Sequence, residues 1–283
     1  MSAHRRALLR ALLLVLLASA LAWRLTDTSA VIATAAFGPA IIYATLVALL
    51  DRRDRARTTL SFAAFLCGAV LATSLAGALN DRLPAWIGRV VPSADAHLLA
   101  PMLGAPVVEE AAKSVVLLVL LLLWREQTAD ARDGIVRGAL VGLGFAAMEN
   151  VLYLSLAALQ GGPAGLARGI YLRGVLYGLN HAAFTATTGA ALGAAQRNLA
   201  RLARAMVVGV GFGLAVAQHV LWNAVASEAI INVLCSPLIA GGPCRSVPSP
   251  SSLYVTAPIL VAVFIGPGVV TLLAITALPR SRP

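Results

Sequence analysis

Long apolar runs separated by short polar segments dominate this chain. Eight runs can be recognised, and each approaches the length that a helix needs to cross a bilayer, about 20 residues. They cover residues 7–23, 31–50, 58–79, 97–124, 134–159, 169–195, 205–226 and 253–278. The runs are continuous rather than alternating, which argues against a β-barrel. The pattern predicts an all-α, polytopic membrane protein with about eight transmembrane helices, in which residues 1–283 form a single integral membrane domain.

The composition agrees with this pattern and narrows the function classes. The 283-residue chain is 59% hydrophobic and only 12% charged, which excludes an ordinary soluble domain. Its net charge of +10 comes from arginines between the apolar runs, where they set topology and meet lipid headgroups rather than nucleic acid. Fifteen arginines flank the runs on the side that holds both termini, against six on the other side. Because cytoplasmic loops carry the excess of positive charge, this asymmetry places both termini in the cytoplasm. The arginine- and alanine-rich composition is typical of a high-GC bacterium, so we expect a multi-pass protein of a bacterial plasma membrane.

Two segments leave alternatives open. The first apolar run follows a basic stretch and contains Ala18-Ser19-Ala20, so it fits a cleaved signal peptide or an uncleaved anchor, of which the anchor is favoured. Cys235 and Cys244 share one polar loop, which the arginine count places outside the cell. Their spacing permits a disulfide there, whereas Cys67 falls inside an apolar run.

The fourth run carries charges that oppose membrane insertion. Glu109, Glu110 and Lys113 lie near its middle, and each costs about 2.5–3.5 kcal/mol there. Spacings of three and four residues put both acids on the helix face that carries the lysine. An ion pair that locks two helices would explain them, but intramembrane charges indicate a functional site by default. We also expect Pro101 and Pro106 to disrupt the start of this helix and to widen access beside Glu109.

Each of the next three runs carries a polar pair with the same four-residue spacing, which turns one polar stripe toward a common interior. Counting from the ends of the runs at 1.5 Å per residue puts the leading polar residue of all four runs in one layer. We therefore expect a four-helix catalytic core within residues 97–227. Its polar residues are Glu109, Glu110, Lys113, Glu149, Asn150, Tyr153, His181, Thr185, His219 and Asn223.

Glycines four residues apart occur in the same part of the chain. Such pairs let membrane helices approach closely. They are Gly138/Gly142, Gly174/Gly178, Gly189/Gly193 and Gly209/Gly213. We expect close packing at these pairs, so that the polar side chains of runs five to seven can meet.

Carboxylates and two histidines in one buried layer suit hydrolysis by an activated water. A carboxylate in an apolar site is a stronger base, and histidine and asparagine can donate hydrogen bonds to a developing oxyanion. A metal is the other option. The residues His181, His219 and one or two of Glu109 and Glu149 match the three-ligand, open site of catalytic zinc. No HExxH motif is present, so both mechanisms stay open.

Four motifs summarise this region. In chain order they are Glu109-Glu110-Ala-Ala-Lys113, Phe145-Ala-Ala-Met-Glu149-Asn150, His181-Ala-Ala-Phe184-Thr185 and His219-Val-Leu-Trp222-Asn223. Over about residues 100–227 the chain thereby resembles the PrsW family of intramembrane proteases. That family is related to the CAAX prenyl endopeptidases, whose paired-glutamate motif usually ends in arginine, so Lys113 fits PrsW better. The resemblance implies hydrolysis of peptide bonds in or near the membrane, with single-span membrane proteins such as anti-sigma factors as substrates in stress signalling.

The resemblance also implies roles for the side chains. Glu109 would activate the water with help from His181, and His219 would bind the oxyanion together with Asn223. The residues that would shape the site are Glu110, Lys113 and Glu149, and Asn150 belongs to the same predicted set. Descriptions of the family include glutamic and metal mechanisms, so the expected cofactor is zinc or none.

Two other function classes compete with a protease. An ion- or proton-coupled transporter also uses intramembrane acids and histidines, but it would favour inverted repeats, and none is convincing between the two halves of this chain. A non-catalytic scaffold could bind single-span partners through the glycine faces. The clustering of polar residues in four adjacent runs suits a site better than a path across the membrane.

Overall fold

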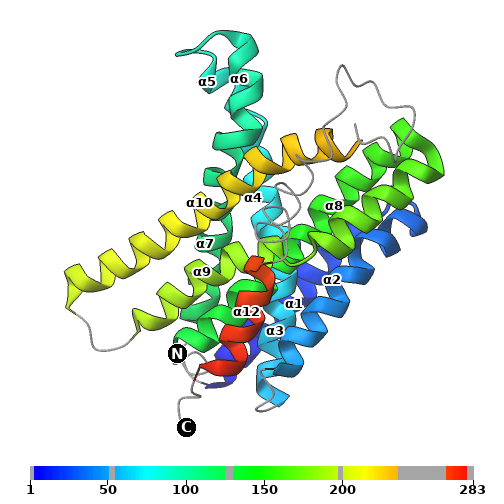
Figure 1. The fold of residues 1–283 in the computed structure, drawn as a ribbon. Helices are drawn as coiled ribbons and strands as arrows, with labels where there is room; N and C mark the ends of the chain where they lie inside the picture. Colours follow the sequence, from blue (N-terminus) through cyan, green and yellow to red (C-terminus); the bar gives the residue numbers. More distant parts are fainter. Residues whose placement is uncertain (1–2, 51–54, 125–129, 197–199, 235–265, 279–283) are drawn as a thin grey trace.

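The computed structural model describes residues 3–50, 55–124, 130–196, 200–234 and 266–278 (Figure 1). Within these ranges the regular structure is entirely helical, and three short segments named η are π-helical. In chain order the elements are α1 (Ala3–Arg24), α2 (Ala30–Leu50), α3 (Arg55–Cys67), η1 (Gly68–Ala72), α4 (Thr73–Asn80), α5 (Leu83–Ile87), α6 (Ser93–Leu99), η2 (Ala100–Gly104), α7 (Ala105–Leu123), α8 (Ala131–Gly169), η4 (Ile170–Leu176), α9 (Asn180–Ala194), α10 (Arg201–Leu234) and α12 (Gly266–Ala277).

The first half of α8 is the central helix of the bundle, and α2, α3, η1 and α9 pack around it (Figure 1). Asp130 begins this helix as its N-cap, because its side chain accepts a 2.9 Å hydrogen bond from the backbone N–H of Asp133. Every residue from Arg132 to Ala147 is buried. A membrane helix buried on all sides needs partners that come very close, and its glycines allow this.

Glycine contacts set the register between α8 and α9. A Cβ atom at Gly134, Gly138 or Gly142 would collide with the α9 backbone at Gly189, Thr185 and His181 in turn. The partners run in opposite order along the two sequences, so the helices are antiparallel. On another face of α8, a Cβ at Gly144 would collide with the carbonyl oxygen of Phe65 in α3. This packing places His181 beside α8 at the depth of the predicted site.

The predicted glycine pairs have different outcomes. Close backbone packing is confirmed for Gly138/Gly142 and for Gly189/Gly193. The pair Gly174/Gly178 instead faces the side chains of Pro39 and Tyr43 in α2. For Gly209/Gly213 the prediction is wrong, because no atom of the described residues lies within 4 Å of a Cβ at either position. Instead, α10 packs closely on α9 through the intervening Gly211, which faces Ala191. The face of α10 that packs is therefore the one that carries Gly211, not the one that carries Gly209 and Gly213.

Among the described residues, five helical stretches are long and apolar enough to cross a membrane, judged by length and composition. Four of them match the first, second, third and seventh predicted runs, and the fifth, residues 131–194, contains both runs five and six. This stretch folds back on itself, since α8 and α9 are antiparallel. The fourth run corresponds to α6, η2 and α7. Of the eighth run the structure describes only α12, and the Cys235–Cys244 loop lies outside the described residues.

Several predicted boundaries are wrong. Run six is not one helix, because a turn at residues 177–179 separates η4 from α9, where Gly178 packs on the ring of Tyr43. The polar segment between runs three and four is helical in part, since it contains α5 and the start of α6. Helix α10 continues to Leu234, past the expected end at residue 226. The separation of runs five and six after residue 159 is confirmed, because Gly162 interrupts α8 with φ 57° and ψ −148°.

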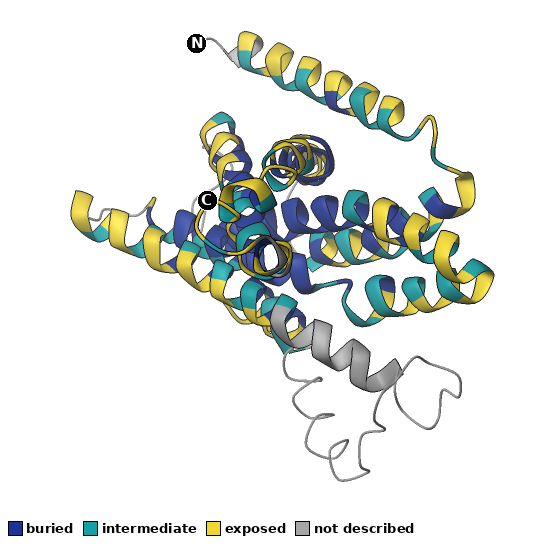
Figure 2. Cartoon of the chain, turned by 90° about the horizontal axis from the view of Figure 1, so that it is seen from above, coloured by how far each residue is buried: buried dark blue, intermediate teal, exposed yellow. Residues whose placement is uncertain are grey.

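Exposed residues lie on the outer faces of the helices, and buried residues gather where the helices meet (Figure 2). Large apolar residues of α1, α2 and α7 are exposed on the outside of the bundle, for example Leu16, Ile42 and Leu122 at 58–69%. Charged residues such as Glu110 and Lys113 are fully buried. Helix α1 lies at the edge and buries only Leu17 in its apolar stretch. This distribution suits a lipid environment, because water would not stabilise so much exposed apolar surface.

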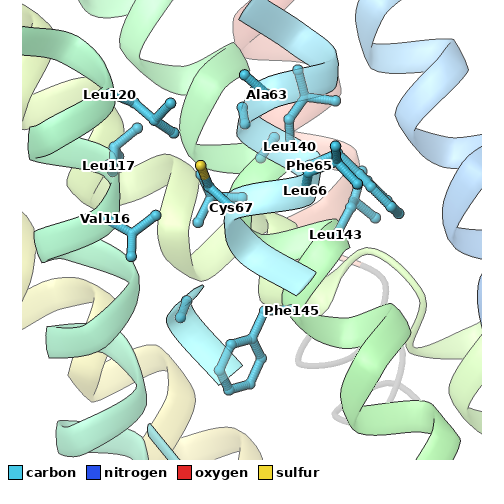
Figure 3. Close-up of a cluster of buried hydrophobic side chains, with 14 of the residues drawn as sticks. Ala63, Phe65, Leu66, Cys67, Val116, Leu117, Leu120, Leu140, Leu143 and Phe145 are labelled. Atoms are coloured by element: carbon cyan, nitrogen blue, oxygen red, sulfur yellow. The ribbon is translucent and has the colours of Figure 1, made fainter. Parts of the chain in front are cut away.

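An apolar core on one side of the polar site holds α3, α7 and α8 together. Cys67 at the end of α3 is buried among the apolar side chains of this core, and Figure 3 shows it near Val116 and Leu117 of α7. Leu140 and Leu143 of α8 belong to the same cluster (Figure 3). The cluster fixes the spacing between α7 and α8, the two helices that carry the glutamates.

The close approach of α8 and α9 predicts a position-specific cost for added methyl groups. We expect Gly142→Ala to lower the stability of the protein by at least about 2 kcal/mol, because the new Cβ would force the two backbones apart. Thermal unfolding in detergent, followed by tryptophan fluorescence, measures the difference. The matched control is Gly209→Ala on the open face of α10, which should leave the midpoint unchanged or raise it slightly. Equal midpoints for the two variants would contradict the packing described above.

Candidate active site

The polar residues of α7, α8, α9 and α10 meet in the interior of the bundle, beside a cavity of about 1020 Å³. Its lining includes Glu109, Glu149, His181 and His219, one from each of these helices. The two prolines expected to disrupt α7 lie beside it. Pro101 is part of the π-helical η2, whose residues line the cavity, and Pro106 stands in the first turn of α7. The prolines do not interrupt the helix, which runs on from α6 through η2 into α7, and the local change is the π-helical turn of η2.

A fully buried ion pair joins Glu110 and Lys113 of α7. The Lys113 ammonium donates to Oε1 of Glu110 over 2.8 Å, and both side chains have no exposed surface. The other oxygen of Glu110 accepts a 3.3 Å hydrogen bond from the hydroxyl of Thr185 in α9. The ammonium also lies 3.9 Å from the centre of the Phe145 ring, which suits a cation. All of these partners offset the cost of burying two charges.

The contacts of His181 determine which of its ring nitrogens carries the proton. Its Nδ1 lies 2.9 Å from Nζ of Lys113. An ammonium group can only donate, so Nδ1 accepts. The proton of the neutral ring is then on Nε2, which donates to Oε2 of Glu149 over 3.1 Å. His181 thus bridges the lysine of α7 and the glutamate of α8.

The second histidine has the opposite arrangement. Nδ1 of His219 lies 3.0 Å from Oε1 of Glu110, which accepts because Lys113 holds this carboxylate in its ionised form. Nδ1 therefore carries a proton, and in the neutral ring Nε2 has a free lone pair. The ring is stacked on Phe184 with the centroids 4.9 Å apart and lies edge-on to His181 at 5.0 Å. These contacts fix its orientation.

Among the described residues, Glu109 holds the one carboxylate oxygen of the cluster that is buried without a hydrogen-bond partner. Its Oε1 accepts from the side-chain amide of Asn80 in α4 over 3.2 Å. Its Oε2 is buried without a hydrogen-bond partner. That oxygen lies 3.6 Å from Nζ of Lys113 and 3.8 Å from Nε2 of His219. A buried acceptor without a hydrogen bond destabilises the protein unless a ligand or a water molecule binds to it.

Arg173 of η4 is a member of the cluster that the sequence did not predict. Its guanidinium donates to Glu149, and its Nε donates to the side chain of Asn150 over 2.7 Å. The same group lies 3.8 Å from the centre of the Tyr153 ring. Because Glu149 also accepts from His181, Arg173 holds the carboxylate that orients this histidine. It stands within the sixth predicted run near its start, where it was counted among the arginines that set topology.

Asn223 is not aimed at the centre of the cluster. Its side-chain amide donates to the backbone carbonyl of Pro101 in η2 over 2.9 Å, and the side chain also lines the cavity. Asn80 was missed as well. It is the last residue of α4, and only the packing of α4 against α7 brings it to Glu109.

Three of the predicted ligands form a group that could hold a metal ion. Glu109, His181 and His219 each offer one ligand atom, and these atoms lie within 4.8 Å of one another. The group fits a cation chemically, because Oε2 of Glu109 lacks a partner and the neutral His219 presents a lone pair at Nε2. Glu110 behind His219 supplies the outer carboxylate that ligating histidines usually have. Glu149, also predicted as a ligand, is outside this group, because Arg173 and His181 occupy it.

The charges of the cluster also favour a cation. When ionised, Glu109, Glu110 and Glu149 outnumber Lys113 and Arg173, which leaves one net negative charge with neutral histidines. His181 is the member that has to change, since both of its nitrogens are engaged. A bound ion would displace either the proton on Nε2 or the ammonium group at Nδ1.

The buried pair predicts a stability cycle. We expect Lys113→Met to cost about 3–5 kcal/mol, because it leaves the Glu110 carboxylate buried without its counter-charge. The double variant Glu110→Gln, Lys113→Met should recover part of that loss, since the amide is neutral. Unfolding midpoints of both single variants, the double variant and the unchanged protein in one detergent give the coupling. A double variant that loses the full sum of the two single losses would rule out a direct interaction.

Comparison with known proteins gives one match. A family model described as "PrsW family intramembrane metalloprotease" matches residues 56–266, which is most of the chain. The matched region includes all four helices that carry the site. No curated protein and no solved structure matches the chain.

Proposed function

The chain belongs to the PrsW family of intramembrane metalloproteases and is an intramembrane peptidase; on that premise we propose that it cleaves single-span membrane proteins with a water activated at Glu109, His181 and His219. The observation that carries this proposal is the buried, unpartnered oxygen of Glu109. It lies within 4 Å of both the Lys113 ammonium and Nε2 of His219, on the wall of a large cavity.

Glu109 is the base in this proposal. Its free oxygen accepts a proton from the attacking water, while Asn80 holds the other oxygen in place. Lys113, 3.6 Å away, favours the ionised carboxylate that the reaction needs at its start. Phe145 and Phe184 pack around the two histidine rings and keep bulk water away from them.

The histidines have separate parts. His181 holds its Nε2 proton against Glu149 and can pass that proton to this carboxylate when Nε2 is needed for a ligand. His219 keeps a proton on Nδ1 through Glu110, so its neutral form offers a lone pair rather than a donor at Nε2. This supports a ligand role for His219 more than the oxyanion role expected from the sequence. Asn223 supports the turn at Pro101 through one of the two N–H groups of its side-chain amide.

The same residues support a second mechanism, in which zinc would be held by Glu109, His181 and His219, and Glu109 would then be a ligand and not the base. Two imidazoles and one carboxylate are a known catalytic zinc set with an open position. When bound, such an ion makes a coordinated water acidic and polarises the peptide carbonyl. Glu110, Arg173 and Glu149 then act from behind, because they hold the two histidine rings at fixed angles.

Substrate enters from the bilayer in this account. The cavity borders η2, where the π-helical turn and the two prolines weaken the regular helix. A substrate helix must lose its internal hydrogen bonds before a peptide bond can be attacked. We propose anti-sigma factors or similar single-span proteins as substrates, and a bacterial plasma membrane with both termini of the enzyme in the cytoplasm. The arginine distribution along the chain supports this orientation.

The protease proposal predicts that one carboxylate is indispensable. We expect Glu109→Gln to reduce cleavage of membrane proteins at least 100-fold, because the amide can neither accept the proton nor hold a cation. N-terminal sequencing of membrane-protein fragments from cells that express each form at equal levels provides the measurement. Asp27→Asn is the matched control, since Asp27 is an exposed carboxylate outside the cavity and its loss should leave the fragments unchanged.

Fragments that persist in the Glu109→Gln cells would contradict the assignment of the base. Flux of ions or protons through vesicles that contain the purified protein, with no peptide product, would favour a transporter. A scaffold would leave both readouts unaffected by the substitution.

The metal assignment has its own test. We expect the protein to bind about one zinc ion per chain by plasma mass spectrometry, and to lose most of it in His219→Ala and Glu109→Gln. Glu149→Gln should still reach one equivalent at saturating zinc, because Glu149 is held by Arg173 outside the ligand group. Loss of the ion in Glu149→Gln together with its retention in Glu109→Gln would exchange the roles of the two glutamates.

A further inference from the structure

The lining of the cavity that contains the site also includes an arginine from the first helix. Arg24, the last residue of α1, lines the same cavity as Glu109 and His219. Neither the proposed reaction nor the metal group uses this side chain. Its position at a membrane helix end would suit a simple lipid anchor, so the way in which its guanidinium is held decides what it can do.

Arg24 is fixed in place through a single nitrogen. Its Nη1 donates to the hydroxyl of Thr73 over 2.7 Å and to the carbonyl oxygen of Ala69 over 3.2 Å. Longer contacts of 3.4 and 3.3 Å reach the carbonyl oxygen of Val70 and the hydroxyl of Ser74. These acceptors lie in and just after η1, where the π-helical backbone turns its carbonyl groups toward the arginine. The guanidinium is therefore oriented before any ligand arrives.

The other side of the guanidinium has no partner in the described part of the chain. Neither Nη2 nor Nε forms a hydrogen bond there, and neither is among the buried unsatisfied atoms, so both remain accessible. No carboxylate of the described residues lies within ion-pair distance of Arg24. Asp81, the acid on the same wall, is beyond the opposite end of α4. A half-buried cation with two free donors in fork geometry is suited to a carboxylate.

One face of α4 connects Arg24 with the reaction centre. The helix contributes to the cavity wall at the spacing of a single helical face, through Thr73, Ala76, Gly77 and Asn80. Thr73 contacts Arg24 at one end and Asn80 contacts Glu109 at the other. Seven residues of helix cover about 10 Å. An extended peptide covers that distance in about three residues. The small side chains at Ala76 and Gly77, between the two ends, leave room for its backbone.

We propose that Arg24 is a specificity residue that binds an acidic side chain of the substrate, an aspartate or glutamate within about four residues of the scissile bond. This deepens the proposed protease function and rests on it for the meaning of the scissile bond. The peptide lies along α4, with its acidic group on Nη2 and Nε of Arg24 and the bond to be cleaved at Glu109. A lipid phosphate is the competing ligand, and the continuity of the cavity with the site favours the peptide.

The test uses binding to a protein that cannot turn over. Fluorescein-labelled peptides of alanine and leucine, identical except for one Glu or Gln, are titrated by anisotropy into the full chain carrying Glu109→Gln in uncharged detergent. The variable residue is placed two, three or four positions from the central bond on either side. We expect the Glu peptide to bind about tenfold more tightly than the Gln peptide at one or more placements, as for a hydrogen-bonded charge.

A second substitution assigns the preference to Arg24. Adding Arg24→Gln should reduce the ratio of the two affinities below about twofold, and Arg24→Lys should leave an intermediate ratio. Arg82→Gln is the matched control, because Arg82 donates to the α4 carbonyl of Ala78, much as Arg24 donates to carbonyls of η1, but lies outside the cavity. It should keep the full ratio. Mere loosening of α1 would weaken both peptides equally and leave the ratio unchanged, which would overturn the proposal.

Other outcomes are equally decisive. Equal affinity for Glu and Gln at every placement, or no measurable binding of either peptide, overturns the proposal without any need for an Arg24 variant. Phosphatidylglycerol retained in native mass spectra by the Arg24 protein and lost with Arg24→Gln, together with equal peptide affinities, assigns the arginine to a lipid headgroup instead. Selective binding of the Glu peptide without cleavage by the unchanged enzyme would refute the proposed function and keep the subsite.

Discussion

The Glu110 carboxylate and the Lys113 ammonium face each other in the middle of α7 with no contact to solvent, and the geometry of the site depends on this pair. Lys113 makes Nδ1 of His181 an acceptor, and Glu110 makes Nδ1 of His219 a donor. One buried pair therefore sets the two histidines in opposite tautomers. Its own burial is tolerable only because Thr185, Phe145 and both histidines complete the hydrogen bonds and solvate the charges. Because Lys113 and His219 are engaged by Glu110, Oε2 of Glu109 stays buried without a hydrogen-bond partner among the described residues. The proposed chemistry takes place at that oxygen.

Such a network needs helices that lie closer than ordinary side chains allow. The glycines of α8 bring its backbone against α9, and this contact carries His181 to within 3.1 Å of Glu149 and 2.9 Å of Lys113. Lipid tails provide little hydrophobic drive for helix association, so small residues and buried polar bonds have to supply it. The same polar residues thereby hold the bundle together and form the site. Substitutions in the cluster are expected to affect stability and catalysis at once, so folding controls are part of every activity measurement on this protein.

Much of this arrangement could be predicted from the sequence, because charges in an apolar run are expensive and so mark a site. Glu109, Lys113, His181 and His219 were found by that cost and by their four-residue spacing. Arg173 and Asn80 could not be found in the same way, since they lie near the ends of apolar runs, where polar residues are ordinary. Spacing alone also failed to separate Gly209 and Gly213 from Gly211, because the face of α10 that packs depends on its angle to α9. The turn at residues 177–179 that starts α9 was missed because the apolar run continues through it. Tautomers and the division between ligands and supporting residues depend on three-dimensional contacts, so the sequence left His219 and Glu149 with open roles.

The histidine tautomers test the account most directly, because they follow from the buried pair alone. The chain has four histidines, so ¹⁵N-histidine labelling and the single variants His181→Ala and His219→Ala assign the resonances of both site residues. In the metal-free protein in detergent at neutral pH, we predict that His181 carries its proton on Nε2 with Nδ1 unprotonated, and that Nδ1 of His219 is protonated. A proton on Nδ1 of His181 would show that Lys113 does not donate to it. That result would contradict the proposed role of the Glu110–Lys113 pair in organising the site.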